Sequence, residues 1–329
     1  MFFRDYTEKV WGISAHDMLP DWGVQRVQNT SLGSIISHSV GINRRVERSL
    51  TERFYYPKHG AGELWEYMAL QVKNMGGKIC LETDVTHIRI TDRKPCVGYK
   101  NSEGEKVEQF DGIISTMPLK EFVLKVNDCP DSIRIIANGL QYRSLIIVAV
   151  EIDKNSIEIA LKKFKDDCWI YIQDTSVKAG RIQILNNWSK EMLSDSESFL
   201  LELEYFCEEG DELWRLSEKD ILGIAIKELQ KLQFIIKDKE VRSWMVERIP
   251  NAYPVYAGSY TRLDEIRQWI NSMEGIYCIG RNGQHHYNNM DHSMQTSYRV
   301  VDYIRGKNSE KEQIWNVNMD SDYHEIKKI

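Results

Sequence analysis

The chain has 329 residues, with 43 Lys and Arg against 49 Asp and Glu, so its formal net charge is −6. This length allows one large domain or two ordinary ones, at about 100–200 residues per domain. Hydrophobic residues make up 42% and charged residues 28% of the chain, which excludes a wholly disordered chain, a collagen-like fibre and a small disulfide scaffold. The mild acidity argues against a general nucleic-acid binder, which would carry a basic face.

The predicted elements interleave helices and strands. Apolar residues at helical spacing predict a helix over 62–76 that ends at Gly76-Gly77. Short strands follow over 78–83, 85–90, 95–100 and 106–110. A hairpin at Gly104 joins the last two of them. Residues 112–118 predict a short apolar strand that is ended by a proline.

Further strands are predicted in the second half of the chain, over 145–152, 168–173, 181–185 and 200–206. Ser217 begins a helix that reaches about Leu232, with Asp220 at the capping-box position. Residues 275–280 predict a strand that runs into a glycine turn, and a helix follows from about Asp291 to Arg305. Because hairpins dominate the middle of the chain, the pattern predicts an α/β (mixed α+β) fold with a large mixed or antiparallel sheet.

The cysteines and the apolar runs indicate the compartment. The six cysteines are scattered without a CxxC pair, which is typical of reduced thiols in a cytosolic protein and argues against structural zinc. No apolar run approaches the roughly 20 residues of a membrane-spanning helix. We therefore expect a cytoplasmic protein with no metal site, no integral membrane segment and no nucleic-acid partner.

Two segments in the first part of the chain contain residues suited to ligand binding. Residues 6–12, followed by Arg26, interleave aromatic and basic side chains that could line a cleft. The alternative is a surface helix with buried Trp anchors. Residues 55–65 contain Gly60-x-Gly62 but lack the third glycine of a dinucleotide-binding turn, so we reject that fingerprint.

Two later segments are stronger candidates. Residues 112–118 place Ser115 and Thr116 at a strand end, which suits a cofactor rim or a plain strand exit. Residues 275–294 run from a strand through a polar loop into a helix at Asp291. A helix N-terminus attracts a phosphate or an anionic ring, although Asp291 also suits a simple helix cap. The histidines of this loop do not match a common metal-ligand spacing.

Together these segments resemble the FAD-dependent amine oxidase/protoporphyrinogen oxidase-like superfamily, in the branch near UDP-galactopyranose mutase. That branch has a YTxKxWG segment, a YPxxGxG-x-LW segment, a strand ending STxP and a GRNGxxxYNNMDHSM segment. Here they are found in the same order, at 6–12, 56–65, 115–118 and 280–294. The resemblance implies an FAD cofactor, a flavin-binding half and a substrate-binding half, and a small-molecule substrate.

The resemblance also implies roles for individual residues. Cofactor contacts are implied for Val85, Ser115, Thr116, Pro118, Gly280, Arg281, Asn288, Asn289, Met290, Asp291 and Ser293. Substrate-cleft positions are implied for Tyr6, Lys9, Trp11, Arg26 and Trp65. The N-terminus of the last helix would stabilise a reduced, anionic flavin. No catalytic residue stands out.

The sequence departs from the family pattern at its start. The strand–GxGxxG–helix unit with which the family opens does not occur in these 329 residues. We therefore expect a fragment: an FAD-linked reductase-like substrate domain plus the C-terminal part of a Rossmann-like FAD-binding domain. The expected substrate parts are 1–76 and 121–257, and the expected FAD-binding parts are 77–120 and 258–329. Exposed apolar surface is expected where the absent unit would pack.

Three functional hypotheses follow. The first is an FAD-dependent oxidoreductase. The second is a flavin-dependent isomerase that acts on a nucleotide sugar in polysaccharide biosynthesis, favoured by residues 6–12. In the third, this chain is not an enzyme by itself, but pairs with a separate FAD-binding chain or is a non-functional remnant. No motif identifies the substrate.

Overall fold

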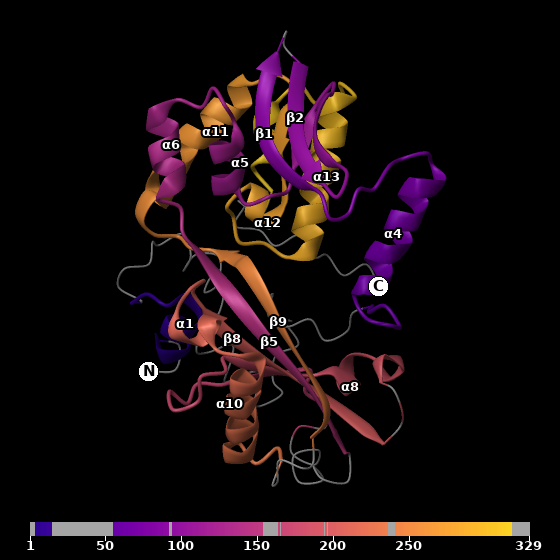
Figure 1. Ribbon diagram of the computed structural model, residues 1–329, viewed down its shortest axis with the longest axis vertical. Helices are drawn as coiled ribbons and strands as arrows, with labels where there is room; N and C mark the ends of the chain where they lie inside the picture. Colours follow the sequence, from indigo (N-terminus) through magenta and orange to yellow (C-terminus); the bar gives the residue numbers. More distant parts are fainter. Residues whose placement is uncertain are drawn as a thin grey trace, which may run out of the picture. The chain divides into compact units, whose positions relative to one another are not determined.

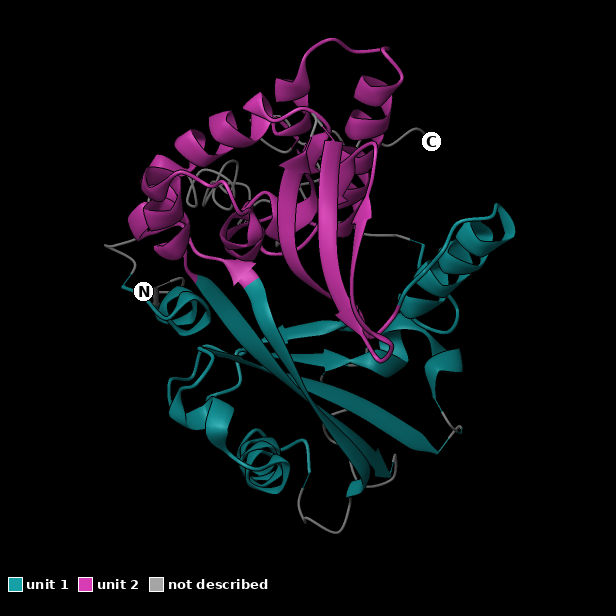
Figure 2. Ribbon diagram, turned by 45° about the horizontal axis from the view of Figure 1, so that its top comes forward, with its two compact units in different colours: residues 1–16, 55–80, 142–252 teal, residues 17–54, 81–141, 253–329 magenta. Residues whose placement is uncertain are grey.

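The computed structural model describes residues 4–14, 55–91, 94–153, 164, 166–193, 195, 197–235 and 241–317. The chain forms two compact units, each built from separate stretches of sequence (Figure 2). Unit 1 contains residues 1–16, 55–80 and 142–252, and unit 2 contains residues 17–54, 81–141 and 253–329. The predicted mixed fold with antiparallel sheets is confirmed.

Unit 1 is built on a five-stranded antiparallel sheet with the strand order β6-β7-β8-β5-β9 (Figure 1). The strands are β5 (Tyr142–Asp153), β6 (Trp169–Tyr171), β7 (Arg181–Ile184), β8 (Ser198–Cys207) and β9 (Val241–Pro254). The helices of this unit are α1 (Arg4–Trp11), α4 (Gly62–Asn74), α8 (Leu185–Trp188), η2 (Lys190–Met192), α9 (Glu212–Arg215) and α10 (Glu218–Lys231).

One face of this sheet forms the core of unit 1. Side chains alternate between the two faces of a strand, and the fully buried Val148 and Leu203 pack with Ala225 and Leu229 of α10. Ser217 caps α10 as predicted, because its hydroxyl accepts a hydrogen bond from the Asp220 amide at 3.2 Å. The alternate positions of β7 and β8 lie on the opposite face of the sheet, which we call the open face.

Helix α1 is held to unit 1 through the Lys9 ammonium. Its Nζ donates hydrogen bonds to four backbone carbonyls, those of Ile172 (2.8 Å), Asp174 (3.0 Å), Val177 (2.9 Å) and Ala179 (3.2 Å). Burial lowers the pKa of Lys9, while nearby carboxylates oppose this effect. The lysine therefore orders the loop that joins β6 to β7.

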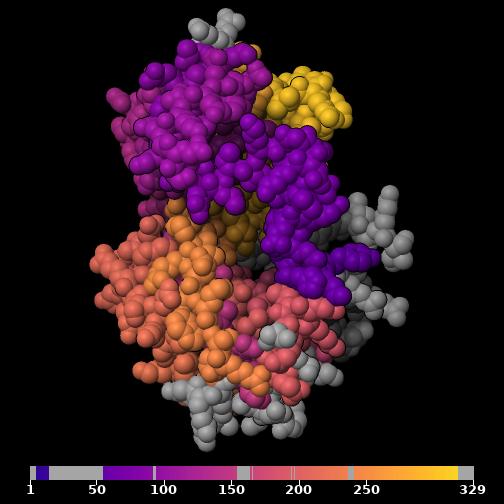
Figure 3. All heavy atoms as spheres, turned by 45° about the vertical axis from the view of Figure 1, so that its right-hand side comes forward, coloured from indigo at the N-terminus to yellow at the C-terminus, as the bar shows by residue number. Residues whose placement is uncertain are grey.

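The helix predicted over 62–76 is confirmed as α4. Apolar residues at helical spacing usually form a buried face, but α4 has none. None of its residues is buried, although its sequence is rich in large apolar side chains. Trp65 is 40% and Leu70 52% exposed, and α4 lies on the face shown in Figure 3. Helix α4 therefore exposes apolar surface, and the packing of an absent unit against it stays a prediction.

Unit 2 contains an antiparallel sheet β1-β2-β3 and a parallel pair, β4 with β10. Its strands are β1 (Asp84–Thr91), β2 (Lys94–Asn101), β3 (Gly104–Gln109), β4 (Ile113–Ser115) and β10 (Ile276–Cys278). Its helices are α5 (Leu119–Lys125), α6 (Asp131–Asn138), η4 (Gly258–Arg262), α11 (Leu263–Ser272), α12 (Gly280–Gly283), α13 (Met290–Ile304) and η5 (Lys311–Ile314).

The predicted strand over 78–83 is wrong. Lys78, Ile79 and the residues after them form no strand, and regular pairing begins only at Asp84. Glu82 adopts a left-handed backbone conformation with φ of 52°, which interrupts an extended chain. Helices α5, α6 and α11 and strand β9 were not predicted, although the buried residues of α6 and α11 recur at helical spacing. No helix among the described residues is long and apolar enough to cross a membrane.

Replacing Lys9 should destabilise unit 1 strongly. Lys9→Met keeps an apolar stem but leaves three partly buried carbonyls, those of Ile172, Val177 and Ala179, without this donor. At about 1–3 kcal/mol for an unsatisfied buried polar group, we expect a loss of about 2–4 kcal/mol in a urea unfolding experiment. Lys73→Met, at an exposed position of α4, should change stability by less than about 0.5 kcal/mol. Equal effects of the two substitutions would contradict the structural role of Lys9.

Candidate functional site

The predicted cofactor residues of unit 2 gather where β4 and β10 end together. The two strands pair in parallel, with Ser115 opposite Cys278. The Ile279 amide donates to the Ser115 carbonyl at 2.9 Å, just beyond the strands. Parallel strands with matched carboxyl ends form the kind of edge at which open α/β sheets bind ligands. Ser115 is buried, and Thr116 beside it is exposed.

Two glycines draw the chain tightly across this edge. A Cβ on Gly283 would lie 2.9 Å from the Ser115 carbonyl oxygen, so only glycine allows α12 to approach β4 so closely. Gly280 has φ of 75°, and its amide donates to the Thr296 hydroxyl at 3.0 Å. The turn α12 is thereby fixed both to β4 and to α13.

Helix α13 presents its N-terminus at the same turn. Asn289 caps the helix, and a reciprocal capping box joins it to His292. Met290 and Asp291 are exposed in the first turn. A helix N-terminus carries partial positive charge and attracts anions. The cap is Asn289 and not Asp291, so the expectation that Asp291 caps the helix is wrong; the exposed Asp291 carboxylate lies in the first turn, where this charge favours it.

The buried polar atoms that have no hydrogen-bond partner among the described residues include the Ser115 hydroxyl and the side-chain nitrogen of Asn288. These two residues are 5% and 2% exposed. The Asn288 side-chain oxygen is satisfied, because the Ser293 hydroxyl donates to it at 2.9 Å. Buried polar atoms are normally hydrogen-bonded, so each of these two atoms keeps an unused hydrogen-bonding capacity.

Arg281 contacts protein groups around the same turn. Its Nε donates to the Asn288 carbonyl at 2.8 Å, and a second guanidinium nitrogen donates to the same oxygen at 2.6 Å. The guanidinium lies 5.1 Å from the Tyr253 ring centroid and 4.9 Å from that of Tyr287. Arg281 thus holds the backbone that enters α13.

The histidines of the loop lie in an aromatic cluster. The Tyr256 hydroxyl is 3.1 Å from His286 Nδ1 and accepts a hydrogen bond from the Tyr287 amide at 2.7 Å. Burial lowers the pKa of His285 to about 4, so this ring is neutral at physiological pH. No group of three metal-ligating residues occurs in the described part of the chain.

The other predicted cofactor residues lie elsewhere in unit 2. Pro118 precedes α5 and is partly buried. Val85 lies at a β-bulge near the start of β1, where its carbonyl accepts a hydrogen bond from Lys125 at 2.6 Å. The contacts described for Val85 are with β2 and Lys125 and not with the turn between β10 and α13. Its role in cofactor binding stays a prediction.

The predicted substrate-cleft residues belong to unit 1. Trp11 is 2% exposed, which fits the alternative interpretation of α1 as a helix with a buried Trp anchor. Tyr6 contacts Tyr171 edge to face at 5.3 Å. The Lys9 ammonium is used by four carbonyls, as described above, and Trp65 is exposed on α4. Arg26 lies outside the described residues. A substrate role for these side chains stays a prediction.

The sequence analysis missed a polar cluster on the open face. Gln183 Nε2 donates to Glu202 and to Glu204, in both cases at 2.9 Å, and Arg181 Nε donates to Glu204 at 2.8 Å. Burial, and then the Glu204 charge, raise the pKa of Glu202 to about 7, although Arg181 opposes the shift. Glu202 can therefore give or take a proton near neutral pH. The alternation of Glu with Leu along 200–204 was the available signal.

Aromatic side chains flank this cluster. Strand register places Trp169 beside Gln183 and Tyr171 beside Arg181, and cross-strand neighbours share a face. The two rings are 44% and 52% exposed. Trp169 also contacts Trp188 at 4.6 Å. The open face thus combines an ionisable carboxyl with accessible aromatic surface.

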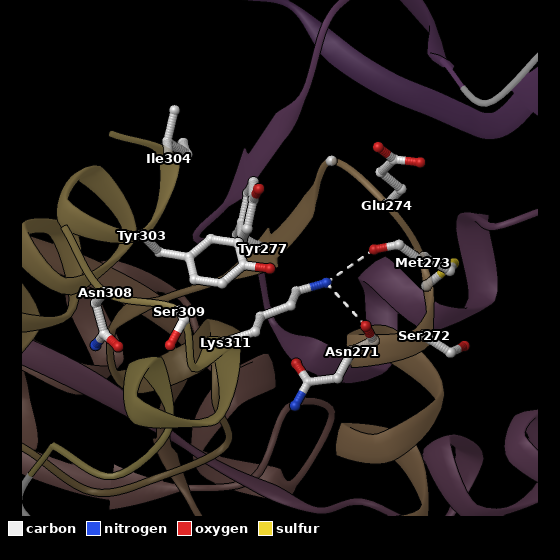
Figure 4. Close-up of a pocket in the computed structure, with 11 residues that line it drawn as sticks. Asn271, Ser272, Met273, Glu274, Tyr277, Tyr303, Ile304, Asn308, Ser309 and Lys311 are labelled. Atoms are coloured by element: carbon white, nitrogen blue, oxygen red, sulfur yellow. Dashed lines mark hydrogen bonds between the residues drawn. The ribbon is translucent and has the colours of Figure 1, made fainter. Parts of the chain in front are cut away.

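A separate cavity of about 620 Å³ in unit 2 contains none of the predicted site residues. Tyr277, Tyr303 and Lys311 line it (Figure 4). The Lys311 ammonium donates to the carbonyls at the end of α11, including that of Met273 at 2.8 Å. Burial lowers the pKa of Lys311 to about 8. The Lys311 ammonium therefore satisfies the backbone carbonyls at the C-terminal end of α11.

Known structures share this fold. A reduced UDP-galactopyranose mutase matches with a TM-score of 0.78 and 19% identity, over 98% of this chain and 68% of that one. A proposed protoporphyrinogen oxidase from Exiguobacterium sp. 255-15 matches with a TM-score of 0.59 and 16% identity, over 78% and 53% of the two chains.

A redesigned putrescine oxidase matches with a TM-score of 0.56 and 12% identity, over 76% of this chain and 53% of that one. No protein-family model and no curated protein matches the sequence. The likeness to these three structures confirms the resemblance predicted from the sequence at the level of the fold.

The raised pKa of Glu202 predicts how stability depends on pH. The carboxyl favours the folded state when it is protonated, below its ordinary pKa of 4.5, and this contribution is lost as the pH rises through about 7. Glu202→Gln should therefore gain stability relative to the wild type between pH 5 and pH 8, by about 1–3 kcal/mol in urea unfolding. Glu66→Gln, at an exposed position, is the control and should show no such trend. A Glu202 variant that follows the control would contradict the raised pKa.

Proposed function

We propose that this protein is a flavoprotein that holds FAD in unit 2, at the turn between β10 and α13, and that it acts as an FAD-dependent oxidoreductase. The observation that carries the proposal is the pair of buried, unpartnered polar atoms, on Ser115 and Asn288, beside a helix N-terminus. The likeness to flavoenzyme folds supports FAD as the ligand. A flavin offers ring oxygens and nitrogens that accept hydrogen bonds, together with phosphates that suit a helix N-terminus.

The residues present fit such a cofactor. Ser115 and Asn288 would donate to it, Thr116 is exposed beside Ser115, and Gly283 lets α12 pack against the end of β4. When bound, the flavin would serve as the hydride acceptor for a small-molecule donor. The chain itself would hold and orient the ring and supply the positive end of α13.

The open face of unit 1 supports a substrate-binding role in this proposal. Glu202 could move a proton at neutral pH, and Trp169 and Tyr171 offer apolar surface to a ring or a chain of carbon atoms. The substrate itself stays unidentified. All six cysteines lie among the described residues and none forms a disulfide, which supports the cytoplasmic location that we propose.

A second candidate is a flavin-dependent isomerase that acts on a nucleotide sugar. It is favoured by the mutase likeness, which extends over 98% of this chain, and by residues 6–12. In such a reaction the flavin takes part without net oxidation of the substrate. The two candidates therefore differ in whether an electron acceptor is consumed.

Flavin binding tests the proposal directly. The purified chain should quench FAD fluorescence with a saturable, one-to-one isotherm. Ser115→Ala should bind FAD about tenfold more weakly, as expected for the loss of one hydrogen bond worth about 1.4 kcal/mol. Ser297→Ala is a matched control, because its hydroxyl bonds within α13, to the Ser293 carbonyl. A chain that binds no FAD would overturn the proposal.

The type of reaction can be decided with the flavin-loaded protein. An oxidoreductase should bleach the flavin absorbance at about 450 nm when it meets its donor, and the colour should return with an acceptor. We expect such bleaching with at least one member of a panel of amines and alcohols. Conversion of UDP-galactopyranose by the dithionite-reduced protein, without bleaching by any donor, would instead establish the isomerase.

A further inference from the structure

The cavity of about 620 Å³ in unit 2 lies at the end of β10 that is remote from the proposed flavin turn. Gly275, just before the first residue of β10, lines the cavity, whereas the turn begins after Cys278, the last residue of the strand. The end of α11, the last turn of α13 and η5 surround the rest of it (Figure 4). Its size falls within the roughly 300–1,000 Å³ of small-molecule sites. The cavity is therefore a separate candidate site.

Two tyrosines form an apolar corner in this cavity. The ring centroids of Tyr277 on β10 and Tyr303 on α13 are 5.8 Å apart, and the ring planes meet at 65°. Ile304, which also lines the cavity, adds an aliphatic side chain that is 56% exposed. Aromatic rings prefer offset-stacked or edge-to-face contacts, and a planar ring in this corner can stack on one tyrosine while its edge meets the other. The corner thus fits a planar apolar body.

Lys311 places a positive charge beside this corner. Its Nζ lies 5.1 Å from the Tyr277 ring centroid. The same atom donates hydrogen bonds at 3.2, 3.3 and 2.8 Å to the carbonyls of Ile270, Asn271 and Met273. These dipoles orient the ammonium but leave its net charge, and no carboxylate among the described residues forms an ion pair with it. Because a partly buried charge is costly without an opposite charge, the cavity favours an anionic ligand.

The acidic groups near Lys311 do not supply the opposite charge. Glu312, its neighbour on η5, forms an ion pair with Arg267. Glu274 lines the cavity but is exposed to solvent, which screens its charge. The buried Cys278 thiol stays protonated, because burial raises its pKa. An anion that enters the cavity would therefore be the partner that balances the lysine.

Hydroxyl donors for an anion are also present. Tyr277, Tyr303 and Ser309 line the cavity, and within the described part of the chain their hydroxyls have no hydrogen-bond partner. In Figure 4 the Tyr303 side chain extends from α13 toward Lys311. Burial raises the pKa of Tyr277, and Tyr303 and Glu274 act in the same direction, so this phenol stays protonated and can donate. Hydrogen bonds to a carboxylate are stronger than those to a neutral acceptor.

We propose that this cavity binds a small aromatic carboxylate, whose ring occupies the corner between Tyr277 and Tyr303 and whose carboxylate faces Lys311 and accepts hydrogen bonds from the neighbouring hydroxyls. Binding there does not depend on FAD, because no residue of the proposed flavin turn lines the cavity. A neutral ring of the same shape would keep the aromatic contacts and lose the attraction to the lysine. The site is thus defined by a planar ring with one negative group.

The first test compares two probes of similar shape and different charge. Cinnamate and cinnamamide share the same planar ring and chain, and only cinnamate is an anion at neutral pH. In calorimetric titrations of the full chain, cinnamate should bind one to one, with a dissociation constant at least tenfold lower than that of cinnamamide. Equal affinities, or no saturable binding of cinnamate, would overturn the proposal and leave the proposed function intact.

A charge placed in the cavity tests the location. Ile304→Glu adds a carboxylate at a side chain that is already 56% exposed, so the variant should fold, and repulsion should weaken cinnamate binding at least fivefold. Leu70→Glu is the matched control, because it makes the same change on α4 at a side chain that is 52% exposed and lies outside the cavity. It should leave binding unchanged. If only Leu70→Glu weakens binding, the probe binds the apolar surface of α4 and the proposal is wrong.

Removal of the lysine charge tests the origin of the preference for an anion. Lys311→Met keeps an apolar stem and should weaken cinnamate binding at least tenfold, while the affinity for cinnamamide stays the same. Circular dichroism reports whether the variant folds, since its α11 carbonyls lose a donor. Ile304→Glu remains as an independent test if it does not fold. A folded Lys311→Met variant that still prefers cinnamate to cinnamamide would overturn the proposal.

Binding to the wild-type chain should also depend on pH. Burial lowers the pKa of Lys311 to about 8, so the free protein loses this charge between pH 7 and pH 9, while cinnamate stays ionised. The affinity for cinnamate should therefore be constant just below pH 7 and fall about fivefold by pH 9, whereas that for cinnamamide should not change. A fall of the same size in Lys311→Met would show that another group titrates and would contradict the role of Lys311.

Discussion

The close approach of α12 to the end of β4 is the constraint on which the candidate site depends. Gly283 leaves no room for a side chain against the Ser115 carbonyl, and the parallel pairing of β4 with β10 fixes the register of that contact. With α12 held there, Gly280 reaches Thr296 and the chain enters α13 at a defined point. Two glycines and one strand pair thus decide where the helix N-terminus lies.

The same loop shows how binding and support are divided. Burial leaves the His285 ring neutral and enclosed, and the aromatic rings around Arg281 are used to hold the backbone. Polar residues in a dense loop are therefore not equivalent. The Ser115 hydroxyl and the Asn288 side-chain nitrogen are buried and have no hydrogen-bond partner among the described residues, so they keep an unused capacity to donate. Unit 1 shows a similar division, since Lys9 orders a loop while Glu202 keeps an ionisable carboxyl on the open face.

Much of the secondary structure could be predicted from local patterns. The continuous apolar run of β5, the alternation of Leu and Glu in β8, the serine cap of α10 and the helix at α13 all follow from spacing and capping chemistry. The strand over 78–83 was wrong because Glu82 turns the backbone, and α4 shows that apolar spacing predicts a helix without predicting its burial. The polar cluster of Gln183, Glu202 and Glu204 was missed because it joins two strands.

The sequence by itself determined the order of the motifs, the resemblance to a flavoenzyme superfamily and the segments in which we propose cofactor contacts. Only the tertiary structure decided what each residue does there. Arg281 and Asn288 are seven positions apart, and no spacing shows that one bonds the backbone of the other while an amide remains unpartnered. The physical reason is that the partner of a hydrogen-bond donor depends on the groups that surround it after folding. Those groups come from distant parts of the chain.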